Sequence, residues 1–158
     1  MIIDSSVVLA ILRDEPERAT FVAAINDAEE RNLSAASLVE CSVVLDSRYG
    51  AVSITALDHF IAEAGIDIIP VDANQARLAR LGFRRFGRGR HPARLNFGDC
   101  FSYALSRALE QPLLFKGRGF VQTDVECHPA SGKAGQVNEP AAIYEVQPRR
   151  RSSRSKRA

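Results

Sequence analysis

Short apolar segments alternate with helical segments from residue 1 to about residue 120. Four segments have the length and composition of buried strands: MII (1–3), NLSAAS (32–37), IDIIPV (66–71) and PLLFK (112–116). Short, apolar strands of this kind are typical of parallel sheets, because helices cover both faces of such sheets. The alternation therefore predicts an α/β fold, a three-layer α/β/α sandwich with a short-stranded parallel sheet.

Helices are expected in the intervals between these strands, at 5–12, 16–30, 37–50, 53–65, 72–87 and 96–111. Gly50 and Gly65 are placed to end the third and fourth of these helices, and Asp72 is placed to cap the fifth. A loop with two glycines, a proline and several arginines, GRGRHPARL (87–95), precedes the last helix.

Three carboxylates lie at junctions between the expected elements. Asp4 ends the first strand, while Glu40 and Asp99 are expected in the first turns of the helices that follow 32–37 and 87–95. Ligands of open parallel sheets bind beyond the carboxyl ends of the strands, so these junctions are where a site is expected. Together the three acids suggest a site for a hard cation such as Mg²⁺ or Mn²⁺, which prefers oxygen ligands.

Each of these acids also has a purely structural explanation. Asp4 is able to cap the first helix, and an acid such as Glu40 is favoured near a helix N-terminus. Asp99 follows Asn96 by three positions, which is the spacing of a weak capping box. Taken singly, the acids are therefore weak evidence for a metal site.

The helical neighbours of Glu40 and Asp99 give different expectations. The predicted core stripe of the last helix consists of Phe97, Phe101, Ala104, Leu105 and Ala108. Asp99 shares another face with Ser102, Ser106 and Glu110, so periodicity predicts no buried setting for it. Glu40 has Val43, Val44 and Ser47 as neighbours. A carboxylate on such a mostly apolar face is costly unless it has a partner, and a divalent cation would be one.

Charge is distributed unevenly along the chain. The last ten residues contain six of the 21 Lys and Arg residues and no acid, so the net charge of +2 hides an acidic body and a basic tail. The pattern of elements fades after residue 126, and we expect a loosely ordered extension at 127–158. Its basic tail (149–157) either contacts an anionic partner such as RNA or is only a solvated run of charge.

Cys41, Cys100 and Cys127 lie far apart, and their spacing suits neither zinc nor an obvious disulfide. We interpret them as reduced thiols. No signal peptide is expected, because a charge occurs at the fourth residue, and no apolar run has the length of a membrane span. A cytoplasmic protein with no membrane segment is therefore expected.

The ordered set of acidic motifs resembles that of PIN-domain ribonucleases, specifically the VapC-type toxins of toxin–antitoxin pairs. The motif with Asp4 is MIIDSSVVLAIL, the motif with Glu40 is LSAASLVECSVVL, and the motif with Asp99 is RLNFGDCFSYALSRALEQPLLFKG. With GFVQTDV, the resemblance covers a nuclease domain at about 1–126. It implies a Mg²⁺- or Mn²⁺-dependent endoribonuclease that acts on RNA, is usually a homodimer and is blocked by a cognate antitoxin protein.

The resemblance also implies roles for single residues. Asp4, Glu40 and Asp99 match the acidic site of the family and would be its catalytic residues and metal ligands. Ser6 matches a small polar position beside the first acid, where it helps to orient a ligand or water. Asp124 in QTDV matches a further acidic position of the family, and it either completes the metal site or only holds its loop.

One departure from the family pattern concerns the segment GRGF. The family commonly has an acid just before this phenylalanine, where the chain has Arg118 and Gly119. Arg118 either contacts RNA phosphate or places a cation where a second metal would lie. Arg88 and Arg90, in the basic segment before Asp99, either bind the RNA backbone or solubilise a loop. The departure supports the alternative function, a degenerate PIN domain that binds RNA or a protein partner without cleavage.

Overall fold

The computed structural model describes residues 1–132, so the basic tail at 149–157 lies outside the described residues. One parallel sheet has the order β3-β2-β1-β4, formed by β1 (Ile2–Ile3), β2 (Asn32–Ser34), β3 (Asp67–Ile69) and β4 (Leu113–Leu114). The helices are α1 (Ser5–Leu12), α2 (Arg18–Asp27), α3 (Ala35–Tyr49), α4 (Val52–Glu63), α5 (Ala73–Phe86), α6 (Asp99–Leu109) and the short 3₁₀ helix η1 (Phe120–Gln122).

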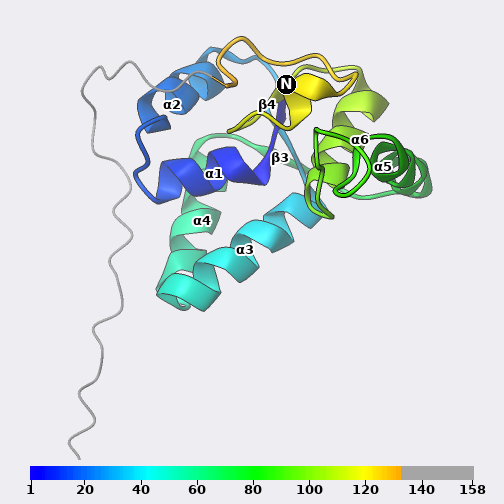
Figure 1. Cartoon of the computed structure of the whole chain (residues 1–158). Coiled ribbons are helices and arrows are strands. Elements are labelled where there is room, and N and C mark those ends of the chain that lie inside the picture. Colours follow the sequence, from blue (N-terminus) through cyan, green and yellow to red (C-terminus); the bar gives the residue numbers. More distant parts are fainter. Residues whose placement is uncertain (133–158) are drawn as a thin grey trace, which may run out of the picture.

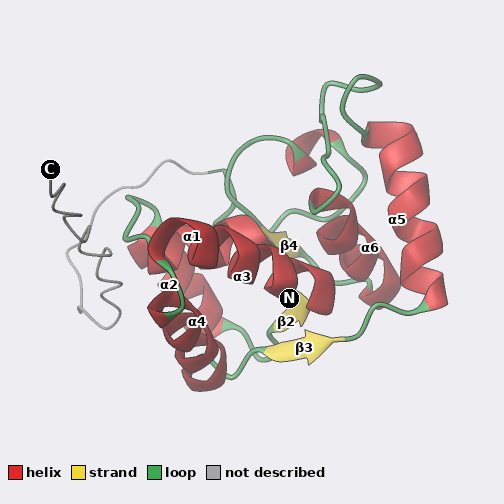
Figure 2. Ribbon diagram, turned by 90° about the horizontal axis from the view of Figure 1, so that it is seen from below, coloured by secondary structure: helices red, strands yellow, loops and turns green. Residues whose placement is uncertain are grey.

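Different helices cover the two faces of the sheet. Ile3 and Leu114 belong to a core shared with α1 to α4, whereas Ile2 and Leu113 belong to a core shared with α5 and α6. Because successive strand residues point to opposite faces, even a two-residue strand contributes to both cores. Figures 1 and 2 show α1 to α4 on one side of the strands and α5 and α6 on the other. The predicted three-layer α/β/α fold is confirmed.

The start of α3 differs from the prediction. The strand β2 ends at Ser34, whose side chain accepts a hydrogen bond from the backbone N–H of Ala36 (3.3 Å) and so caps the helix. The helix therefore begins two residues earlier than expected, at Ala35. As a consequence Glu40 lies in the second turn of α3 and not in its first.

The buried face of α6 also differs from the prediction. Phe97 is 79% exposed, whereas Ser102 and Ser106 are buried. The reason is that α6 packs against both the sheet and α5, so that its buried face is wide enough to include polar side chains. These side chains have partners: Ser102 shares a hydrogen bond with Ser37 (3.3 Å), and Ser106 Oγ donates to the carbonyl of Gln111 (2.7 Å).

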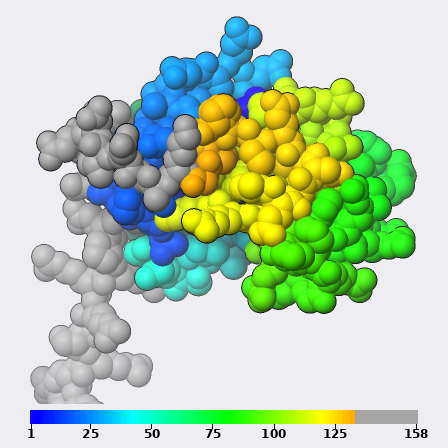
Figure 3. Space-filling model, turned by 45° about the horizontal axis from the view of Figure 1, so that its top comes forward, coloured from blue at the N-terminus to red at the C-terminus, as the bar shows by residue number. Residues whose placement is uncertain are grey.

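Residues 127–131, which we expected to be loosely ordered, continue the fold beside β4. The N–H of Leu113 donates to the carbonyl of Glu126 (2.8 Å), the N–H of His128 donates to the carbonyl of Leu113 (2.9 Å), and the N–H of Phe115 donates to Ser131 Oγ (3.1 Å). Figure 3 shows this segment in orange against the yellow surface of the residues before it. The folded domain thus extends past residue 126.

Helix ends follow the predicted signals. Gly50 and Gly65 come after α3 and α4 with φ angles of 80° and 57°, the left-handed region that favours glycine. Asp72 caps α5 by accepting a hydrogen bond from the N–H of Gln75 (2.7 Å).

All three cysteines are free thiols, as expected. Among residues 1–132, no helix combines the length and the apolar character that a membrane span requires.

Candidate metal site

Asp4 lies where β1 passes into α1, and its carboxylate is almost completely buried (2% exposed). Its Oδ2 accepts hydrogen bonds from the N–H of Ser6 (3.0 Å) and from Ser6 Oγ (2.5 Å), so the predicted capping role is confirmed. The N–H of Lys116 in turn donates to Ser6 Oγ (3.0 Å). This donor directs the hydroxyl proton of Ser6 toward Asp4, and Ser6 therefore fixes the first acid in place.

The other carboxylate oxygen of Asp4, Oδ1, is buried and has no hydrogen-bond partner within the described part of the chain. A buried acceptor without a partner is costly in a folded protein, and a bound cation is one way to satisfy it.

Glu40 is held by residues outside its own helix. Its Oε2 accepts a hydrogen bond from Ser5 Oγ (2.8 Å), the first residue of α1. On its other side it lies against Gly98, directly before α6. Its neighbour Val43 on α3 is exposed, so the apolar face that we expected on α3 does not bury Glu40. Burial, first, and the nearby charge of Asp4 raise the pKa of Glu40, although the hydrogen bond from Ser5 opposes them.

Asp99 and Asn96 form the predicted capping box. The N–H of Asn96 donates to Asp99 Oδ2 (2.7 Å), and the N–H of Asp99 donates to Asn96 Oδ1 (2.9 Å). The expectation that Asp99 has no buried setting was wrong, because its side chain is partly enclosed near two other acids. Burial and then the charges of Asp4 and Glu40 raise the pKa of Asp99 to about 6, against the opposing effects of the Asn96 hydrogen bond and the charge of Arg88.

The structure thus brings together the three acids that the sequence singled out. They come from three junctions far apart in the sequence, yet they lie near enough for their charges to disfavour one another. Within residues 1–132, no three His, Cys, Asp or Glu side chains already stand in an arrangement that could hold a metal ion. Carboxylate donors, a buried unpaired oxygen and mutual repulsion nevertheless fit a hard divalent cation, which would supply the missing positive charge.

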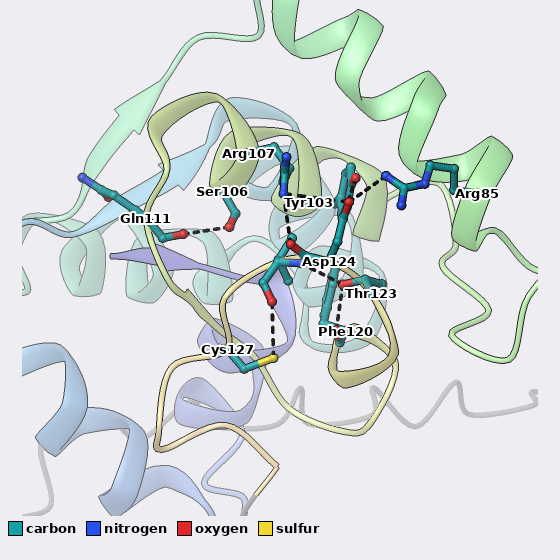
Figure 4. A network of polar contacts seen from close by, with 10 residues as sticks. Arg85, Tyr103, Ser106, Arg107, Gln111, Phe120, Thr123, Asp124 and Cys127 are labelled. Atoms are coloured by element: carbon teal, nitrogen blue, oxygen red, sulfur yellow. Dashed lines mark hydrogen bonds and ion pairs between the residues drawn. The ribbon is translucent and has the colours of Figure 1, made fainter.

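Asp124 lies in a different network. Its Oδ1 accepts from the hydroxyl of Tyr103 (2.9 Å), its Oδ2 forms an ion pair with Arg85 (2.6 Å), and its carbonyl accepts from Arg107 (3.0 Å). Figure 4 shows these three side chains turned toward Asp124. Burial raises the pKa of Asp124, but the Tyr103 hydrogen bond and the arginine charges outweigh it, so the pKa lies below its usual value. These contacts fit the role of holding the loop.

Three arginines are candidates for RNA binding, and they lie in different surroundings. Arg88 is exposed and acts electrostatically on Asp99, so it lies on the rim of the acidic site. Arg90 is exposed and lies with its guanidinium 5.7 Å from the centre of the Phe83 ring. Arg118 is also exposed, in the turn after β4. Gly119 lies beside the segment that leads to α6, since a Cβ atom there would be 3.0 Å from the carbonyl oxygen of Ala93.

Two residues of this site were not found from the sequence. They are Ser5, at the start of α1, and Gly98, directly before α6. The signal for Gly98 was a glycine directly before an acid in a first helical turn, where a helix former is usually preferred.

Comparison with known proteins decides the family. The family model described as PIN domain matches residues 1–126. The chain belongs to the PIN domain family.

The chain is also similar in sequence to three curated ribonucleases. It is 51% identical to a ribonuclease VapC28 of Mycobacterium tuberculosis over 127 residues, which cover 80% of this chain and 96% of that protein. It is 48% identical to a ribonuclease VapC of Mycolicibacterium smegmatis (79% and 97% covered) and 44% identical to a ribonuclease VapC30 of M. tuberculosis (79% and 95%).

Two solved structures share the PIN fold with this chain. The first is M. tuberculosis VapC20, a toxin that cleaves the sarcin–ricin loop, with a TM-score of 0.65 and 16% identity over 78% of this chain and 95% of that chain. The second is a chain of a toxin–antitoxin complex from Klebsiella pneumoniae, with a TM-score of 0.59 and 11% identity over 86% and 98%. At this low identity the two structures support the fold alone.

Proposed function

We propose that this PIN protein is the toxin of a toxin–antitoxin pair and a Mg²⁺- or Mn²⁺-dependent endoribonuclease that acts in the cytoplasm. The observation that carries the proposal is the convergence of Asp4, Glu40 and Asp99 at one place, with one buried oxygen of Asp4 left without a partner among the described residues. The names of its closely similar relatives, ribonuclease VapC, support the same activity.

Each acid would have a distinct part in this reaction. A divalent cation bound here would stabilise negative charge on the phosphate oxygens and lower the pKa of a bound water. Asp4 is held rigidly by Ser6 and would present its free Oδ1 to the cation. Glu40 and Asp99 would each contribute a carboxylate oxygen, and Asp99 keeps one oxygen outside its capping box. A bound cation would neutralise the repulsion among the three carboxylates, and this gain would favour its binding.

The direct test is RNA cleavage by the purified protein with Mn²⁺, with Mg²⁺ and with EDTA. We expect cleavage within the RNA chain with either metal and none with EDTA. Cleavage that continues in EDTA would contradict the proposed metal dependence. Metal binding or RNA binding without cleavage would favour the alternative, a degenerate PIN domain, which the arginine and glycine of GRGF support.

Arg88 is the best placed of the proposed RNA-binding residues, because it lies on the rim of the acidic site. We expect Arg88→Gln to raise KM for RNA by about 3- to 10-fold and to reduce the salt dependence of binding, with Mn²⁺ affinity nearly unchanged. The same substitution at Arg77, an exposed residue of α5 whose charge does not act on Asp99, is the control. An unchanged KM in the Arg88 variant would assign that residue to loop solubility. Arg90 and Arg118 are proposed to add weaker contacts with RNA phosphate.

The missing fourth acid offers a gain-of-function test. We expect Gly119→Asp to tighten Mn²⁺ binding by about tenfold, which corresponds to about 1.4 kcal/mol, because it restores the acid that the family commonly has just before this phenylalanine. The backbone of Gly119 is helical, and the new Cβ would meet only the carbonyl of Ala93 closely. Gly119→Asn provides the matched control of the same size without the charge. Equal Mn²⁺ affinity in the two variants would show that position 119 does not contribute to the site.

A homodimer and an antitoxin complete the proposal. Between α5 and α6 the surface has a largely apolar hollow of about 610 Å³, with Phe83, Phe97 and Phe101 among its lining residues. We propose that a second copy of the chain covers it. Sedimentation of the protein as a monomer at micromolar concentration would contradict the dimer.

The antitoxin is expected to be the product of a neighbouring gene, and failure of that protein to inhibit cleavage would contradict the pairing.

A further inference from the structure

Gly98 lies directly against the carboxylate of Glu40. A Cβ atom at position 98 would be 2.6 Å from Glu40 Cδ and still closer to both carboxylate oxygens. Non-bonded carbon atoms keep about 3.5–4.0 Å apart, so no side chain at position 98 is compatible with the present place of the carboxylate. Glu40 thus occupies the volume that a side chain at residue 98 would fill.

The backbone itself does not require glycine here. The φ and ψ angles of Gly98 are −63° and −46°, which are ordinary helical values. Because Asn96 and Asp99 exchange the hydrogen bonds of a capping box, residue 98 lies inside the first turn of the helix. Alanine would favour that conformation more than glycine does. The advantage of glycine at this position is therefore its missing side chain.

On its other side, the Glu40 carboxylate is held by α1. Ser5 Oγ donates a hydrogen bond to Glu40 Oε2 (2.8 Å). The carbonyl of Ser5 also accepts a contact from the thiol of Cys41 (3.7 Å), the buried residue that follows Glu40. Two connections between α1 and α3 therefore direct Glu40 toward the position that Gly98 leaves open.

We propose that Gly98 is a positioning residue, whose missing side chain forms the seat of the Glu40 carboxylate beside Ser5, Asp4 and Asp99. The consequence for metal binding rests on the proposed function, whereas the seat itself does not. Because a glutamate carboxylate is the end of a flexible side chain, Gly98→Ala should displace it at little cost in folding. The displaced carboxylate would lose its hydrogen bond from Ser5 and its place near the other two acids.

A thermal double-mutant cycle in EDTA tests the seat without any metal. In the Glu40→Ala background no carboxylate is in the way, so we expect Gly98→Ala to raise Tm by roughly 2–4 °C through helix propensity. In the wild-type background the increase in Tm should be smaller than in the Glu40→Ala background by at least about 2 °C, because the substitution also displaces Glu40. Equal shifts of Tm in the two backgrounds would overturn the proposal that Gly98 makes room for the Glu40 carboxylate.

Calorimetric titration with Mn²⁺ tests the consequence for the site. We expect Gly98→Ala to weaken Mn²⁺ binding by about tenfold or more, within the range found when residues that orient metal ligands are changed. In the Glu40→Ala background Gly98→Ala should have no further effect. With the shorter Glu40→Asp side chain, which leaves room for a methyl group, Gly98→Ala should weaken binding less than it does in wild type. Wild-type affinity in the Gly98→Ala protein would overturn the positioning role.

The two experiments separate the inference from the proposed function. If wild type neither binds Mn²⁺ nor cleaves RNA, the proposed function fails, and with it the role of Gly98 toward a metal. The thermal cycle then still decides whether Gly98 seats Glu40. If wild type binds Mn²⁺ and the Gly98→Ala protein binds it equally well, the inference alone fails.

Discussion

Replacing Asp99 with asparagine is expected to abolish metal-dependent RNA cleavage and to stabilise the metal-free protein. Loss of a charged ligand should lower kcat/KM by at least about 100-fold, or roughly 2.7 kcal/mol of transition-state stabilisation. Asparagine keeps an oxygen that can accept the hydrogen bond from the Asn96 N–H, so the capping box is retained. Removal of a charge that lies near Asp4 and Glu40 relieves repulsion.

The gain in stability depends on pH. Because the pKa of Asp99 is about 6 in the folded protein and near 3.8 otherwise, the folded state binds more protons between these values. Stability in EDTA should therefore fall as pH rises from about 4 to 6 and stay low above that range. One pKa unit corresponds to about 1.4 kcal/mol, and partial screening by solvent should leave an effect of about 1–2 kcal/mol at pH 7.

Thermal melts of wild type and Asp99→Asn in EDTA at pH 5 and pH 7 measure this effect. The variant should melt roughly 3–8 °C higher at pH 7, and the difference should shrink at pH 5. Asp72→Asn is the matched control, because Asp72 caps α5 with a similar hydrogen bond but is exposed. A variant that cleaves RNA like wild type would contradict the role given to Asp99. So would a Tm difference between variant and wild type that is smaller at pH 7 than at pH 5.

The second large effect concerns folding. Gly82→Ala is expected to destabilise the protein by about 1–3 kcal/mol, the usual cost of overpacking a core. Gly82 is in the interior of α5, and a Cβ atom there would be 2.5 Å from Cδ1 of the Tyr103 ring on α6. The ring is 1% exposed, and its hydroxyl donates to Asp124, so it cannot move aside freely. The two helices would have to separate.

Urea unfolding of Gly82→Ala measures this cost, and Gly98→Ala provides the comparison. Both substitutions add one methyl group at a helical backbone position, but one meets a fixed ring and the other meets the end of a flexible side chain. Gly82→Ala should lower the stability of the protein without a direct effect on the three acids of the metal site. Gly98→Ala should lower the affinity for Mn²⁺ without lowering the stability. A Gly82→Ala protein as stable as wild type would contradict the close packing of α5 on α6.

Local sequence signals predicted the parts of the structure that depend on neighbouring residues. The alternation of elements gave the three-layer fold, and the positions of Asp4, Glu40 and Asp99 at element junctions indicated one shared site. The capping box of Asn96 and Asp99 was also visible from spacing alone. Each of these features follows from residues a few positions apart or from the general rule for parallel sheets.

Features that depend on contacts between distant elements could not be predicted in this way. The burial of Ser102 and the exposure of Phe97 follow from the packing of α6 between the sheet and α5, which helical periodicity does not specify. The hydrogen bond of Ser5 and the open space at Gly98 appear only when α1, α3 and α6 meet. The contacts of Asp124 with Tyr103, Arg85 and Arg107 likewise join side chains from different parts of the chain.

The central claim is that Asp4, Glu40 and Asp99 together hold one divalent cation. The most direct measurement is anomalous X-ray scattering from crystals of the protein soaked in Mn²⁺. We expect an anomalous peak within coordination distance of Asp4 Oδ1 and of carboxylate oxygens of Glu40 and Asp99. Absence of a peak there at saturating Mn²⁺, or a peak beside Asp124 instead, would contradict the claim.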